Sequence, residues 1–117
     1  MAPQGPYKLV TVNNAPERAS RLVGRVIEDM KERYTIVHAA NAESPSTAKQ
    51  VIEEHQPHIV FTASMWTPEE SSMVVSEARN INPEVKTLVL PQGLQLEKGP
   101  DAVVEYIKEQ LPALIER

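Results

Sequence analysis

The chain of 117 residues has no cysteine and only four glycines. Without cysteine it cannot form a disulfide, a Cys-ligated zinc site, an iron–sulfur cluster or a thiol nucleophile. The glycines are scattered along the chain, and neither GxGxxG nor GxxxxGK[ST] occurs. The sequence therefore excludes thiol chemistry and the glycine-rich loops that cradle phosphates.

Positive charge and long apolar runs are also scarce. The chain has 12 basic against 16 acidic residues, a net charge of −4, which argues against nucleic acid or an anionic membrane surface as a partner. No run approaches the 18 apolar residues of a membrane helix, and the first ten residues lack the apolar stretch of a signal peptide. We therefore expect a cytoplasmic protein that binds neither nucleic acid nor membrane.

What the sequence does contain is an alternation of short apolar segments and amphipathic ones. Strands are predicted at residues 8–12, 35–39, 58–63 and 85–90, and helices begin at Pro16, Pro45, Pro68 and near Asp101. Ser44 is the expected N-cap of the second helix, and Thr67 with Glu70 three positions later predicts a capping box at the start of the third. This order predicts a three-layer α/β domain, an open parallel sheet with helices on both faces. We expect residues 1–6 to be a flexible leader and residues 7–117 to form the domain.

Helical periodicity predicts which side of each helix is buried. In the first helix, Leu22 and Val26 share the core face, while Arg18 and Arg21 are expected on the opposite, polar face. In the third helix we expect the core face to carry Met73, Val74, Ala78 and Ile81.

The residues that follow the predicted strands contain few titratable groups. Ligands of such sheets bind beyond the carboxyl ends of the strands, yet no Asp or Glu stands there, and His38 has no evident partner in the sequence. Acid–base catalysis and binding of hard metals both need carboxylates or a positioned histidine. We therefore expect no enzyme activity, no metal site and no cofactor, and we expect His38 to be a satisfied residue at a strand end.

Several segments resemble, in order, the receiver domain of bacterial response regulators. They are LVTVNNAPE (9–17), EEHQPHIVFTASMWTPEE (53–70), ARNINPEVKTLVLPQ (78–92) and KGPD (98–101). In receivers, the corresponding segments carry an acidic pair, the phosphoacceptor Asp, a Ser/Thr switch and a Lys-Pro pair. The resemblance covers residues 7–117 and implies a flavodoxin-like sheet with strand order 2-1-3-4.

At the positions that carry receiver chemistry, this sequence departs from the family. The resemblance places the two metal-binding acids on Asn13 and Asn14, the phosphoacceptor on Ala63 or Ser64, the switch hydroxyl on Pro91 and the lysine on Lys98. Neutral amides do not hold a hard cation as carboxylates do. Alanine has no nucleophile, and a serine there has no adjacent base. The resemblance therefore implies a pseudo-receiver without phosphorylation chemistry.

A second departure is a short connection between the fourth strand and Lys98. Residues 91–97 are too few for the helix and strand that receivers usually carry there. We expect the fourth helix to be shortened or missing, with at most a short fifth strand at residues 94–97. The uncovered edge would favour self-association or a protein partner.

Each candidate site residue also has a purely structural interpretation. Asn13 and Asn14 suit a strand-to-helix turn, Ser64 could cap a loop, and Lys98 could be a solvated side chain instead of an anion tether. Trp66, the only tryptophan, could either anchor a partner together with Met65 or pack within its loop.

Two functions remain open at this level. The first is a non-catalytic, phosphorylation-independent signalling module that acts by protein–protein interaction, with a second copy of the chain as one candidate partner. The alternative is a small-ligand or nucleotide-binding module of the flavodoxin-like type that uses the same strand ends. Residues 13–18 lack the Ser/Thr/Gly pattern expected to hold a flavin phosphate.

Overall fold

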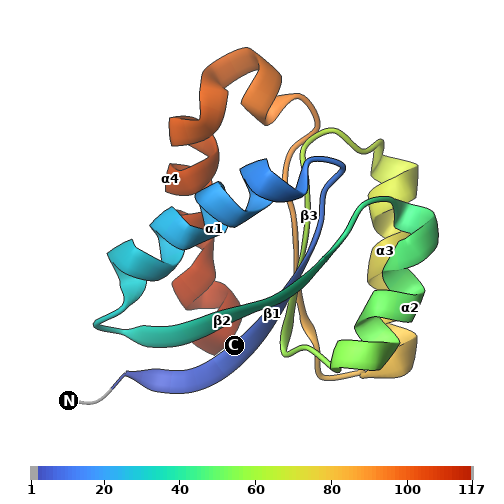
Figure 1. The fold of residues 1–117 in the computed structure, drawn as a ribbon, viewed down its shortest axis with the longest axis horizontal. Coiled ribbons are helices and arrows are strands. Elements are labelled where there is room, and N and C mark those ends of the chain that lie inside the picture. Colours follow the sequence, from blue (N-terminus) through green and yellow to red (C-terminus); the bar gives the residue numbers. More distant parts are fainter. Residues whose placement is uncertain (1–2, 117) are drawn as a thin grey trace.

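The computed structural model describes residues 3–116, in which four strands alternate with four helices (Figure 1). The elements are β1 (Gln4–Val12), α1 (Pro16–Met30), β2 (Tyr34–Ala42), α2 (Pro45–His55), β3 (Ile59–Thr62), α3 (Pro68–Ile81), β4 (Lys86–Val89) and α4 (Leu94–Glu116). The strands pair in parallel in the order β2-β1-β3-β4. The predicted fold class and strand order are confirmed.

Helices cover both faces of the sheet, which gives two apolar cores. As Figure 1 shows, α1 and α4 lie on one face and α2 and α3 on the other. Leu9, Phe61 and Leu88 point toward α1 and α4, whereas Val10 and Val60 point toward α2 and α3. Because the central strands are buried on both faces, their sequences are apolar without alternation.

The register of the sheet brings the carboxyl ends of the strands together. Val12 at the end of β1 pairs with Ala42 of β2 and with Thr62 of β3, and Thr62 in turn pairs with Val89 of β4. The residues that follow these strands therefore share one edge of the sheet, where ligands of open parallel sheets bind.

The start of α3 shows the predicted capping box. The Thr67 hydroxyl accepts a hydrogen bond from the Glu70 backbone N–H at 3.1 Å, and the Glu70 carboxylate accepts one from the Thr67 N–H at 3.0 Å. The two bonds satisfy donors that a helix start leaves without partners. They fix α3 directly after the loop that follows β3.

Three features differ from expectation. β1 begins at Gln4, inside the expected leader, because the Gln4 N–H donates to the Arg33 carbonyl at 3.0 Å; Met1 and Ala2 lie outside the described residues. Met73 is 44% exposed, since the buried face of α3 is formed by Ser71, Val74 and Ala78. Ser44 stands at the N-cap of α2, yet its hydroxyl contacts the hydroxyls of Ser46 and Thr47 in place of a backbone N–H.

The chain after β4 is helical where at most a short strand was expected. Residues 94–98 form the first part of α4, and the helix bends at Gly99, whose φ of 83° and ψ of 176° are non-helical. A positive φ of this kind favours glycine. The fourth helix of the receiver pattern is thus reduced to this short first part, and within residues 3–116 β4 is an edge strand. Pro112 does not end α4, which continues to Glu116.

None of the helices within residues 3–116 combines the length and the apolar character needed to cross a membrane.

Candidate functional site

The ends of β1 and β3 place four of the predicted site residues next to one another. The Ala63 N–H donates to the Val12 carbonyl at 3.1 Å, and the Asn13 N–H donates to the Ala42 carbonyl at 2.9 Å. Asn13 and Ala63 therefore continue the sheet pairing beyond the last strand residues, and Asn14 and Ser64 follow them directly in the chain. We call these four residues the strand-end cluster.

The amide of Asn13 shapes the turn from β1 into α1. Asn13 is only 5% exposed, and its Oδ1 accepts a hydrogen bond from the Ala15 N–H at 2.7 Å. Its carbonyl accepts another from Asn41 Nδ2 at 2.9 Å. Asn14 is exposed, and its N–H lies 3.4 Å from the Met65 sulfur. Asn13 thus has the turn chemistry that its residue type favours.

Ser64 joins the end of β3 to the start of α4. Ala63 and Ser64 are each 7% exposed. The Ser64 carbonyl accepts a hydrogen bond from the Gly93 N–H at 2.8 Å, and its hydroxyl accepts one from the Gln95 N–H at 3.3 Å. In the described part of the chain no carboxylate or imidazole is bonded to this hydroxyl, so no neighbouring base activates it as a nucleophile.

The two remaining positions of the receiver pattern lie outside the strand-end cluster. Pro91 and Lys98 are both exposed. The Pro91 carbonyl accepts a hydrogen bond from the Leu94 N–H at 3.1 Å, which closes the turn before α4. For Lys98, at the bend of α4, no hydrogen bond or ion pair to the cluster occurs within residues 3–116.

Trp66 ties the loop after β3 to the end of β1. Its indole Nε1 donates to the Val12 carbonyl at 2.8 Å, and its ring packs, partly buried, against the core on the α2 and α3 face. Met65 beside it is also partly buried. Packing within the domain therefore explains the hydrogen bond of the indole N–H and the burial of part of the ring.

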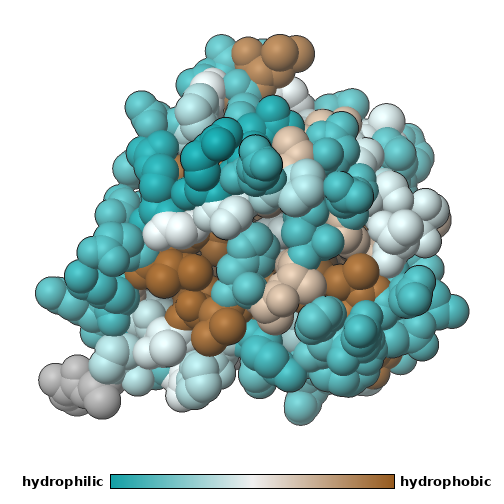
Figure 2. Space-filling view, viewed as in Figure 1, coloured by the Kyte–Doolittle hydropathy of each residue, from teal (hydrophilic) through white to brown (hydrophobic). Residues whose placement is uncertain are grey.

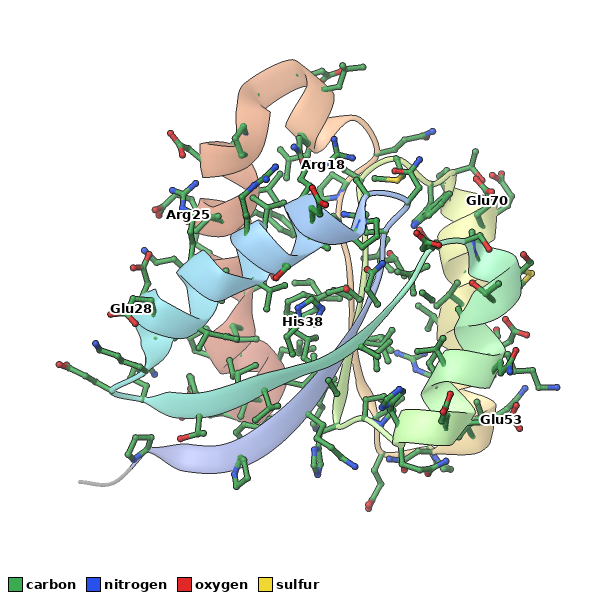
Figure 3. All side chains as sticks on the ribbon, viewed as in Figure 1. Arg18, Arg25, Glu28, His38, Glu53 and Glu70 are labelled. Carbon is green, nitrogen blue, oxygen red and sulfur yellow. The ribbon has the colours of Figure 1, made fainter. Side chains whose placement is uncertain are left out.

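The His38 side chain, on β2 (labelled in Figure 3), belongs to a short network of polar side chains. Its Nε2 lies 2.9 Å from the Thr11 hydroxyl, which donates to Asn41 Oδ1 at 2.6 Å. Since the hydroxyl proton of Thr11 is used on Asn41, the imidazole nitrogen is the donor to Thr11. Burial lowers the pKa of His38 below 6.5, and the Ala40 backbone partly opposes this shift.

The lowered pKa of His38 predicts a pH-dependent stability. The folded state binds this proton less readily than the unfolded state does. The free energy of unfolding should therefore be highest above pH 6.5 and fall as the pH decreases through the His38 pKa of the folded state. Urea unfolding of wild type and His38→Gln between pH 7.5 and 5 measures this, and the variant should lose part of the slope. An imidazole that titrates above 6.5 by NMR would contradict the assignment.

Arg18 is the residue at this end of the sheet that sequence reasoning missed. The helical period predicts Arg18 on the polar face of α1, and the structure places it on a cavity beside Ser64, Met65 and Gln92. Figure 3 shows it in the first turns of α1, below the first part of α4. Its nearness in sequence to the end of β1 was the available signal. Within residues 3–116, no group of three His, Asp or Glu side chains is placed so that it could hold a metal ion.

Comparison with known proteins gives structural matches only. No protein-family model matches the sequence, and no curated protein does. The isolated receiver domain of RcsB from Salmonella enterica serovar Typhimurium, solved with the phosphomimetic BeF3−, superposes with a TM-score of 0.57 at 10% identity, covering 86% of this chain and 72% of that one.

The signal receiver domain of the response regulator NarL from Mycobacterium tuberculosis, itself described as putative, superposes with a TM-score of 0.51 at 10% identity. The match covers 97% of this chain and 100% of that one. At this level of identity the likeness concerns the backbone. The chain therefore has the fold of response-regulator receiver domains.

Proposed function

We propose that the chain is a non-catalytic, phosphorylation-independent signalling module that acts through protein–protein contacts in the cytoplasm. The observation that carries this proposal is the neutrality of the strand-end cluster within a receiver-like fold. Asn13, Asn14, Ala63 and Ser64 carry no charge, and the Asn13 and Ser64 side chains are engaged in bonds that build the turn and the loop.

The proposal follows from the needs of phosphoryl transfer to a carboxylate. Magnesium binds through oxygen ligands, of which carboxylates contribute most, and it offsets the negative charge that gathers on the transferred group. The two positions that resemble the metal-binding acids carry amides, and one of these amides is bonded to Ala15. Without phosphoryl transfer, a receiver-like domain can still act by binding another protein through its surface.

An exposed apolar side chain supports recognition at the bend of α4. Leu96 is 93% exposed, and Val89 on the edge strand β4 is 41% exposed. Figure 2 shows apolar surface at the top of the view, over the first part of α4. An apolar side chain surrounded by water gains free energy when a partner covers it. We propose a protein as this partner, with a second copy of the chain as one candidate.

Titration with Mg²⁺ and beryllofluoride tests the absence of phosphorylation chemistry. Trp66 reports on the site because its indole is bonded to Val12, next to Asn13. We expect no saturable change in Trp66 fluorescence and no heat of binding by calorimetry. The RcsB receiver domain, which was solved with BeF3−, is the positive control for calorimetry. Saturable, magnesium-dependent binding to this chain would refute the proposal.

Light scattering over a range of concentrations tests the second copy as partner. A mass that rises with concentration, and rises less for Leu96→Asp, would identify the bend of α4 as a self-association surface. Ser76→Asp on α3, also an exposed position, is the matched control. A constant monomer mass would direct the search to a different protein.

A further inference from the structure

A cavity of about 590 Å³ opens at the carboxyl end of the sheet, next to the start of α4. Its polar lining consists of Arg18, Ser64, Gln92 and Gln95, and its apolar lining of Met65 and Leu96. The volume falls in the range of small-molecule sites. No carboxylate is among the lining residues, so the only charge on the walls of this cavity is positive.

The positive charge belongs to a guanidinium without a counter-ion. The Nε of Arg18 is buried and has no hydrogen-bond partner. Within residues 3–116, Arg18 also forms no ion pair, in contrast to Arg25, which is paired with Asp101 at 2.9 Å. Buried polar groups are almost always satisfied in folded proteins. A partly desolvated, unpaired cation indicates that an acceptor belongs beside it.

We propose that this cavity binds a small oxyanion, the carboxylate or phosphate group of a small molecule, with Arg18 as the principal ligand. Among residues 3–116 the terminal nitrogens of Arg18 have no acceptor, so they are available to donate to two oxygens of one anion, as guanidinium groups commonly do. The partial burial of the guanidinium strengthens its attraction for an anion relative to a fully solvated arginine.

The other lining residues fit the same class of ligand. The Ser64 hydroxyl accepts from the Gln95 N–H, which leaves its own proton free for an anionic oxygen. Met65 and Leu96 provide apolar surface for the remainder of an organic acid or a phosphate ester. The inference goes beyond the proposed function, because it concerns reversible binding without magnesium and without a covalent bond to the protein.

Titration with inorganic phosphate, and separately with acetate, tests the proposal and distinguishes the two oxyanions. The probes are the backbone amides of Gly93 and Gln95 in proton–nitrogen NMR spectra, with sodium chloride added to equal ionic strength as the reference. We expect saturable shifts at these amides with at least one of the two oxyanions, beyond any shift that chloride causes. The substitution Arg18→Gln should weaken this binding at least about tenfold, which corresponds to the loss of one charge-assisted hydrogen bond.

Arg21→Gln is the matched control, because it removes the same charge one turn further along α1 at an exposed position and should leave binding unchanged. Arg18→Lys keeps the charge but not the two-pronged donor, so its affinity should lie between those of wild type and Arg18→Gln. Non-saturable shifts equal to those with chloride would overturn the proposal. Equal weakening by Arg18→Gln and Arg21→Gln would also overturn it, since general charge attraction would then explain the binding. Thermal melts of all variants confirm that each is folded.

Discussion

Leu111→Ala should lower the free energy of unfolding by about 2–5 kcal/mol, the usual cost of removing a buried leucine side chain. Leu111 is 0% exposed and lies in the core between the sheet, α1 and α4. Truncation removes apolar contacts and leaves a cavity that a sheet covered on both faces cannot readily close. Urea unfolding followed by circular dichroism gives the free energy directly.

Gln110→Ala is the control for this change, because the neighbouring side chain is exposed on the same helix. It should alter the free energy of unfolding by less than about 0.5 kcal/mol. A loss below about 1 kcal/mol for Leu111→Ala would mean that the second part of α4 is not an integral part of the core.

Ala63→Asp should be the most damaging change in the strand-end cluster, because it places a carboxylate at a position that is 7% exposed. A buried charge without a partner costs on the order of 3 kcal/mol. Burial raises the pKa of such a carboxyl, so the folded state binds its proton more readily than the unfolded state does. The deficit relative to wild type should therefore shrink as the pH falls from 7 to 4.

Ala63→Asn separates charge from shape, because the amide has nearly the same size and is neutral. At pH 7 it should be less destabilising than Ala63→Asp, and its deficit should not depend on pH in this range. Magnesium should not rescue Ala63→Asp, since Asn13 and Asn14 supply no further carboxylate. A protein as stable as wild type at pH 7, or one that magnesium stabilises strongly, would show that the cluster still accommodates a cation.

The sequence predicted the parts of the fold that depend on local chemistry. The period of α1, the Thr67 capping box and the apolar runs of β3 and β4 were sufficient for the element order. The parallel sheet follows from the helices between the strands. The closeness of the residues in the strand-end cluster could also be predicted, because parallel strands have their carboxyl ends at the same edge of the sheet.

The sequence could not predict features that depend on contacts between distant segments. Residues 94–98 are too short to show a helical period, and their conformation depends on bonds to Ser64, about 30 positions earlier. The same holds for Arg18, whose place on a cavity wall depends on where α4 begins. The helical period that places Met73 in the core covers a wider face than α3 buries, since its buried residues are Ser71, Val74 and Ala78.

The bend at Gly99 divides α4 into two parts with different local stability. The first part spans only residues 94–98, too short to be stable as an isolated helix, and it is held by the Gln95 bond to Ser64 and by the packing of Leu94 against the core. The second part is anchored by Val103, Ile107 and Leu111 in the core. Because parts of a protein with few buried contacts open at a lower free energy, we expect less protection from hydrogen exchange in the first part than in the second. Gln95 and Leu96, which line the cavity, then belong to the part of α4 with the lower local stability.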